Sequence, residues 1–204
     1  MGPLNPRTGA ELLGDDAVLT EIAAGVHEAG NPYFDHVLGG PEAARRILDA
    51  WVRRPSSEVF AGRARLLFEG ETLVGGFVAM TGGECKRCRM ADTAALLAAH
   101  RGDERTALLA RLAGVKGIFA PLEDGDWYVS KVWVSPRLRG KGYGGLVSRE
   151  AFFPEPRPPG RILADVAESN AAALATYRRL GLEIVPGAGS PSALRYAVVR
   201  RSSP

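Results

Sequence analysis

The chain has 204 residues, 46% of them hydrophobic and 24% charged, which is enough for one globular domain with its own core. With 26 basic and 23 acidic residues the formal net charge is only +3, which lacks the basic excess of a nucleic-acid-binding protein. The sequence has neither an apolar run of membrane-spanning length nor the apolar stretch of a signal peptide. We therefore expect a cytoplasmic protein without nucleic-acid or membrane partners.

The N-terminal quarter of the chain is predicted to be helical after a loose start. Residues 1–14 are rich in Pro and Gly and are expected to form a flexible arm. Asp15 or Asp16 can cap a helix that ends at Gly30-Asn31-Pro32, and Pro41 can begin a second helix. The aromatic link between them, residues 33–36, is suited to core packing or to the wall of a pocket.

Two strands are predicted next, at about 59–68 and 72–81, joined by a turn at Glu69-Gly70-Glu71. From Met90 to Gly114 the apolar residues recur at helical spacing, with a break at Arg101-Gly102-Asp103. Residues 82–126 are therefore predicted to be a helical insert between two strands.

The chain has two cysteines, Cys85 and Cys88, at the spacing of a redox or zinc pair. A structural zinc site needs four ligands, and no second pair exists. The histidines, at positions 27, 36 and 100, are scattered. We expect two reduced thiols and no metal site.

A glycine-rich loop follows the next predicted strand, Trp127 to Val134, which Pro136 ends. The loop places two basic side chains among three glycines, in the order Arg139, Gly140, Lys141, Gly142, Tyr143, Gly144. Glycine lets successive N–H groups approach a ligand, and the helix predicted from about Gly144 directs its positive end at the loop. The pattern is typical of an anion-binding loop, best suited to phosphate.

Other interpretations of the loop fit less well. A P-loop needs Ser or Thr after Lys141, and Gly142 stands there. The spacing of Gly140, Gly142 and Gly145 matches a Rossmann turn, but the loop lies late in the chain, and Asp165 only loosely matches the acid that such a turn requires. The remaining alternative is a surface turn with solvated basic residues.

After a proline-rich linker, residues 161–167 are predicted to form a strand, and Asn170 to cap a helix that runs through Leu180. Gly181 stands where a helix-ending glycine belongs, and residues 182–185 and 194–199 are expected to form a final antiparallel pair.

These segments resemble the GNAT family of N-acetyltransferases. Arg139, Gly142 and Gly144, following Val-x-Val-x-Pro, are similar to the family's motif A, which holds the pyrophosphate of acetyl-coenzyme A. Asn170, Tyr177 and the flanking strands are similar to its motif B. The resemblance covers about residues 127–185. The insert at about 82–126 departs from the family, and Leu12-Leu13 is a poor candidate for the family's short first strand.

The resemblance implies an α/β fold with a mixed, twisted, mostly antiparallel sheet and helices on both faces, the acyl-CoA N-acyltransferase fold, as a single domain over residues 15–204. The strands at 127–134 and 161–167 would be parallel neighbours that splay apart to admit acetyl-CoA. The implied contacts of the cofactor are the backbone near Val132, Trp133 and Val134, the loop from Arg139 to Gly144, Asn170 and Tyr177.

The implied activity transfers an acetyl group to a primary amine of a small-molecule or peptide acceptor. Tyr177 would protonate the leaving thiolate, and a backbone N–H near Val132 would hold the oxyanion. The candidates for the base are Glu84 and Asp126, with Asp92 as a third, and water is the alternative to all three. The insert would form a wall of the acceptor site, or else a cover over one sheet face or a homodimer contact. A non-catalytic acyl-CoA-binding sensor is the alternative function.

Overall fold

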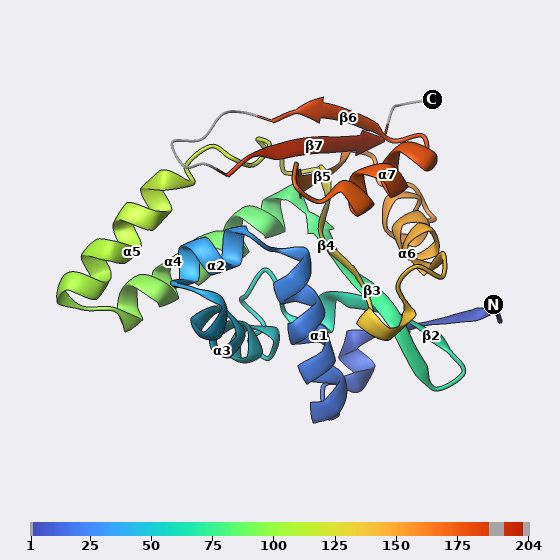
Figure 1. Cartoon of the computed structure of the whole chain (residues 1–204), viewed down its shortest axis with the longest axis horizontal. Coiled ribbons are helices and arrows are strands. Elements are labelled where there is room, and N and C mark those ends of the chain that lie inside the picture. Colours follow the sequence, from blue (N-terminus) through green and yellow to red (C-terminus); the bar gives the residue numbers. More distant parts are fainter. Residues whose placement is uncertain (1, 188–193, 202–204) are drawn as a thin grey trace.

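The computed structural model describes residues 2–187 and 194–201, and its centre is a sheet with the strand order β1-β2-β3-β4-β5-β7-β6 (Figure 1). The strands are β1 Leu4–Thr8, β2 Ala64–Glu69, β3 Thr72–Thr81, β4 Trp127–Val134, β5 Ile162–Ala167, β6 Glu183–Pro186 and β7 Tyr196–Arg201. Every neighbouring pair is antiparallel except β4 and β5, which are parallel. The predicted mixed, mostly antiparallel sheet is therefore confirmed.

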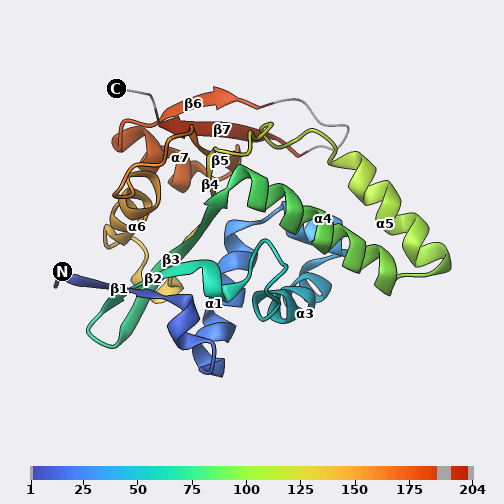
Figure 2. The same cartoon turned by 180° about the vertical axis from the view of Figure 1, so that it is seen from behind.

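Helices cover both faces of this sheet, as Figures 1 and 2 show. The α-helices are α1 Asp16–Ala29, α2 Tyr33–Leu38, α3 Pro41–Val52, α4 Gly82–Ala99, α5 Gly102–Gly114, α6 Tyr143–Phe152 and α7 Ala171–Arg179. Short 3₁₀ turns lie at Gly9–Leu12, Ala61–Arg63 and Pro136–Leu138. Buried residues of α1 to α5 share one hydrophobic cluster, and buried residues of α6 and α7 share another with the opposite face of the sheet.

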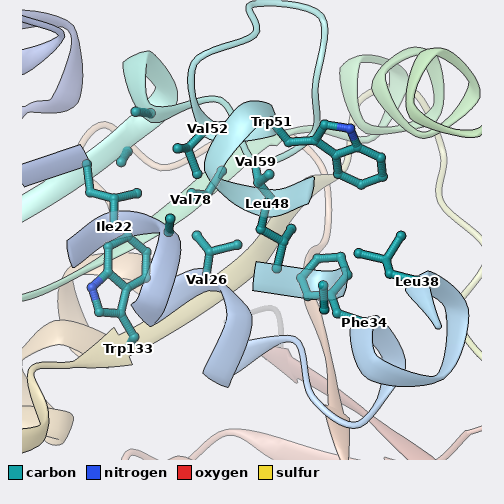
Figure 3. Close-up of a cluster of buried hydrophobic side chains, with 14 of the residues drawn as sticks. Ile22, Val26, Phe34, Leu38, Leu48, Trp51, Val52, Val59, Val78 and Trp133 are labelled. Atoms are coloured by element: carbon teal, nitrogen blue, oxygen red, sulfur yellow. The ribbon is translucent and has the colours of Figure 1, made fainter. Parts of the chain in front are cut away.

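The larger cluster packs α1 against β4 and α3 against α1. Ile22 and Val26 of α1 and Leu48 of α3 are fully buried there, with Ile22 next to the indole of Trp133 (Figure 3). Gly25 permits this close packing, since a Cβ at that position would lie 2.2 Å from Cδ1 of Trp133. The side chain of Trp133 is therefore part of the core under α1.

The expected flexible arm at residues 1–14 is wrong for most of its length. Leu4–Thr8 pairs with β2 as an edge strand, and the 3₁₀ turn at Gly9–Leu12 follows it. Proline indicated a loop, but an edge strand tolerates Pro6 where its missing N–H would face solvent. The family's short first strand thus lies before Leu12-Leu13. Of the domain expected over residues 15–204, residues 188–193 and 202–204 lie outside the described part of the chain.

The aromatic link expected at residues 33–36 is the helix α2. The insert begins with α4 at Gly82, eight residues before the predicted helical pattern. A capping box starts this helix: Oγ1 of Thr81 accepts from the N–H of Glu84, and Glu84 Oε2 accepts from the N–H of Thr81 at 3.0 Å. The predicted break between two insert helices exists, but it lies at residues 100–101 rather than 101–103, since α5 begins at Gly102.

Candidate active site

The parallel strands β4 and β5 separate soon after they begin. Their pairing is limited to Trp127 with Ile162 and Tyr128 with Leu163. Beyond that point no strand within the described residues lies beside the edge of β4 that faces β5. The predicted splay of two parallel neighbours is confirmed, and it leaves backbone groups without ladder partners at the centre of the sheet.

The direction of these backbone groups follows from the pairing of β4 with β3. The N–H of Ser135 donates to the carbonyl of Val74 at 2.8 Å, so Ser135 faces β3. Residues of an antiparallel pair alternate in direction, so Val134 and Val132 point their N–H and C=O groups toward the open edge. Trp133 points its backbone groups to β3 and its indole to α1, which leaves it no hydrogen-bonding group at the open edge.

A bulge lies in β4 just before these residues. The register with β3 shifts between Val78 and Ala79, so that Ser130 is an extra residue on β4. Ser130 and Lys131 both reach the carboxylate of Glu58 on the face covered by α1 to α5. A bulge re-aims side chains and interrupts pairing, and here it does both at the start of the open edge.

The glycine-rich loop forms an open cradle of N–H groups at the far end of β4. Gly140 and Gly142 have φ angles of 72° and 87°, in the left-handed region that favours glycine. Gly142 is the N-cap residue of α6, and it has no side chain to occupy the first N–H groups of that helix. The N–H groups of residues 140–144 make no hydrogen bond to any residue that the structure describes. Such a set of free donors at a helix N-terminus fits a pyrophosphate.

Two side chains of the loop are held by neighbours. Arg139 forms an ion pair with Glu28 of α1, and its Nε and Nη2 each donate to the carbonyl of Val134 at 3.3 Å. The buried Tyr143 donates its hydroxyl to Oε2 of Glu69 at 2.7 Å. Tyr143 can therefore serve a ligand only through its backbone, while Lys141 is exposed beside the cradle.

On the other side of the splay, Asn170 follows β5 and caps α7, as predicted. Its Oδ1 accepts from the N–H of Ala173 at 3.1 Å. The amide nitrogen of its side chain makes no hydrogen bond to the described residues and remains available as a donor.

Tyr177 lies on α7 in the cluster that also packs against Val132 and Val134. Its ring meets Phe152 of α6 edge to face at 5.2 Å between centroids. Its hydroxyl makes no hydrogen bond to the described residues, and burial raises the pKa of Tyr177, so the phenol is neutral at physiological pH. The arrangement agrees with a proton donor and also with a core aromatic residue.

The candidate bases are each occupied by structural bonds. Glu84 forms the capping box of α4. Asp126 accepts from Nε of Arg161 at 2.9 Å and from the N–H of Glu123 at 2.7 Å, and it lies four residues before the bulge, roughly 13 Å along a strand. Asp92 pairs with Arg54 and accepts from Ser57. A base role for any of them stays a prediction.

Sequence reasoning missed Glu58, which lies at the centre of a buried polar network. Nε of Arg89 donates to Oε2 of Glu58 at 3.0 Å, and Nζ of Lys131 donates to Oε1 at 3.3 Å. The hydroxyl of Ser130 donates to the same carboxylate. Burial would raise the pKa of Glu58, but the charges of Arg89 and Lys131 outweigh it and hold the pKa well below its ordinary value. These partners are 31 and 73 residues away in the sequence, so no local spacing could indicate the cluster.

We expect Glu58→Gln to destabilise the protein by about 3–5 kcal/mol, because it leaves two buried cations uncompensated. The matched control is Glu183→Gln, which removes an exposed pair with Arg200 and should cost about 1 kcal/mol or less. Because the folded pKa of Glu58 is depressed, its stabilisation is present above the pKa of an unfolded glutamate and declines as the pH falls toward the folded pKa. Urea unfolding should therefore show the difference between wild type and Glu58→Gln shrinking below about pH 4.3. Equal stability of wild type and variant at pH 7 would contradict this.

Beside Glu58 lies a cavity of about 250 Å³ between the N-terminal helices and the insert. Its lining is Tyr33, Phe34, Val37, Leu38, Trp51, Glu58, Val59, Arg89, Asp92, Thr93, Leu96, Leu112, Val115 and Phe119. Tyr33 and Phe34 therefore form a pocket wall, one of the two roles considered for the aromatic segment, and α4 and α5 form the other side. Glu84 is not part of the lining.

A larger depression, of about 570 Å³, lies near Asp126, Arg157 and Arg161. It is at the beginning of β4 and β5, where the strands are still paired, at the opposite end of β4 from the cradle.

Cys85 and Cys88 are free and buried on α4, and burial raises the pKa of Cys85 to about 12. Among residues 2–187 and 194–201, no group of three or more His, Cys, Asp or Glu residues could hold a metal ion. No helix within these residues is both long enough and apolar enough to cross a membrane.

The chain belongs to the GNAT acetyltransferase family, because the model of the acetyltransferase (GNAT) family matches residues 26–182. It is accordingly an acetyltransferase domain whose donor is acetyl-CoA. None of the curated proteins compared with the chain matches it.

Solved structures share the fold at low sequence identity. The N-acetyltransferase from Staphylococcus aureus Mu50 is 14% identical with a TM-score of 0.66, over 91% of this chain and 96% of that one. A second acetyltransferase has a TM-score of 0.57 at 14% identity, over 97% and 98% of the two chains. A GNAT-family structure from Desulfovibrio desulfuricans has a TM-score of 0.53 at 13% identity, over 98% and 99%.

Proposed function

We propose that the protein is an N-acetyltransferase that moves the acetyl group of acetyl-CoA to a primary amine. The observation that carries the proposal is the combination of the open edge of β4 with the free N–H groups of residues 140–144. The open edge of β4 can bind the amide-rich pantetheine arm of the cofactor in the manner of an added strand. The free N–H groups of residues 140–144 can bind its pyrophosphate.

Different residues of this chain would bind different parts of acetyl-CoA. Val132 and Val134 offer backbone groups to the pantetheine arm of the cofactor along β4, and Asn170 offers a side-chain donor from the N-terminus of α7. Arg139 and Lys141 supply positive charge beside the cradle. When bound, the cofactor supplies a thioester whose carbonyl carbon an amine can attack.

Two groups serve the reaction itself in this proposal. Tyr177 lies on the face of α6 and α7, and its neutral phenol donates a proton to the departing thiolate. A free N–H of β4 near Val132 stabilises the developing oxyanion. Glu58, the carboxylate beside the bulge, receives four donors, and Asp92 is paired with Arg54 and accepts two further bonds. In this proposal the proton of the amine therefore leaves through water.

The alternative function, a non-catalytic acyl-CoA sensor, differs in a measurable way. A thiol-release assay with acetyl-CoA and a panel of small amines, amino acids and peptides tests the two. Amine-dependent release of CoA, with the acetylated amine detected by mass spectrometry, supports the transferase. Binding of acetyl-CoA in calorimetry without release for any amine would favour the sensor.

A further inference from the structure

The cavity beside Glu58 has a specific chemistry that bears on the identity of the acceptor. Most of its lining is apolar, including the aromatic side chains of Tyr33, Phe34, Trp51 and Phe119. Phe34, Leu38 and Trp51 belong to the packed cluster of Figure 3, so this wall is held in place by the core. Its volume of about 250 Å³ is just below the roughly 300–1,000 Å³ of drug-sized ligand sites, which indicates a small ligand.

The acids that line the cavity have little capacity left. Glu58 receives Nε and Nη2 of Arg89 as well as Lys131 and Ser130. Asp92 receives Arg54, the hydroxyl of Ser57 and the N–H of Glu58, the last at 2.9 Å. A carboxylate has about four acceptor sites, so Glu58 has none left, while Asp92 has about one and is already paired with the charge of Arg54.

The donors of the cavity, in contrast, are not exhausted. Arg89 uses Nε and Nη2 for Glu58, and Nη2 also donates to the hydroxyl of Tyr128 at 2.8 Å. Its Nη1 makes no hydrogen bond to any residue within the described ranges. The guanidinium carbon also contacts two rings, at 4.7 Å from the centroid of Phe119 and 4.8 Å from that of Tyr128. The hydroxyl of Tyr33 also has no partner among these residues, and burial raises its pKa to about 12, so it stays a neutral donor.

A rigid cation with a spare N–H group in an apolar chamber favours an anionic or acceptor group on the ligand. The cavity also lies next to the reaction centre, because Glu58 touches both the cavity and the bulge residues Ser130 and Lys131. The bulge marks the beginning of the open edge of β4.

We propose that this cavity binds the acceptor, and that the acceptor is a small amine with an apolar body and a carboxylate that Arg89 receives, as in an apolar amino acid. The inference rests on the proposed acetyl transfer. In the reaction the amine nitrogen forms a bond to the acetyl carbon and the C–S bond breaks. The nitrogen loses a proton to water, the thiolate takes one from Tyr177, and the Tyr177 phenolate regains a proton from water.

Calorimetry of the full chain with three probes of one shape tests the ligand class. The probes are phenylalanine, 3-phenylpropionate, which lacks the amine, and 2-phenylethylamine, which lacks the carboxylate. We expect phenylalanine and 3-phenylpropionate to bind, and 2-phenylethylamine to bind about tenfold more weakly or worse. Equal or tighter binding of 2-phenylethylamine would overturn the assignment.

Two substitutions on α5 test the location. Leu112→Phe adds bulk to a residue that lines the cavity and should weaken the binding of phenylalanine by about tenfold or more. Leu109→Phe, on the same helix, adds the same bulk at a side chain that is 48% exposed and outside the lining, and should change nothing. Unchanged affinity in Leu112→Phe would place the acceptor elsewhere.

Arg89→Lys tests the carboxylate contact while keeping a positive charge beside Glu58. It should reduce the preference for phenylalanine over 2-phenylethylamine, with acetyl-CoA affinity unchanged. Thiol release with 2-phenylethylamine and no preference for phenylalanine would overturn this inference and leave the proposed function intact. Binding of phenylalanine as described, with no transfer to any amine, would overturn the proposed function and leave the binding site intact.

Discussion

Gly142→Val should abolish the binding of acetyl-CoA. Gly142 has a φ of 87° and is the residue from which α6 starts. A β-branched side chain takes this conformation only at a cost of about 1–3 kcal/mol, and its methyl groups would stand where a pyrophosphate meets the N–H groups of residues 140–144. We therefore expect the dissociation constant to rise by about a hundredfold or more, since each 1.4 kcal/mol is a factor of ten.

The matched control is Gly145→Ala, one turn into the same helix. A Cβ at Gly145 meets no atom within 4 Å, and its φ is not in the left-handed region, so the substitution should leave binding unchanged and can favour the helix. Calorimetry measures both affinities, and circular dichroism checks that the variants are folded. Micromolar binding by a folded Gly142→Val protein would show that the cradle does not hold the cofactor.

Tyr177→Phe should lower turnover by about a hundredfold or more, the usual contribution of a general acid. The affinity for acetyl-CoA should stay nearly unchanged, because only the hydroxyl is removed. Stability should not fall, since the hydroxyl is bonded to none of the described residues and the ring keeps its contact with Phe152. A loss of turnover without a loss of stability would separate the catalytic role from simple core packing.

The measurement is thiol release at saturating substrates, with a pre-steady-state experiment to confirm that chemistry limits the rate. Tyr143→Phe is a suitable comparison, because it removes a buried tyrosine hydroxyl that bonds Glu69 rather than facing the cluster of Tyr177. It should affect stability more than the chemical step. Wild-type turnover in Tyr177→Phe under these conditions would remove this residue from the mechanism.

The parts of the fold that could be predicted from the sequence are those in which local chemistry decides the backbone. The loop at residues 139–144 needs positive φ angles at two positions and has glycine at both. Asn170 caps α7 through a bond to a residue three positions away. Thr81 and Glu84 form a capping box, also a local signal, although the predicted helical pattern began only at Met90.

The parts that could not be predicted depend on contacts distant in the sequence. The strand Leu4–Thr8 exists because β2 offers it an edge, and its own composition is that of a loop. Glu58 gains its partners only when α4 and β4 come together, so an acid in a Pro-Ser-Ser segment carried no signal. The cavity could not be predicted for the same reason, because its lining residues lie far apart in the sequence, on α2, α3, α4, α5 and nearby segments.

The contacts of Arg139 have a consequence for how the loop and the strand edge bind a ligand. In the structure this side chain holds Glu28 of α1 and covers the carbonyl of Val134, one of the groups that an added strand would use on β4. A phosphate group that drew Arg139 away would uncover that carbonyl. Binding of one end of a long ligand at the loop would then favour binding of its middle at the strand edge, and the reverse would hold equally, because coupling between two sites is reciprocal.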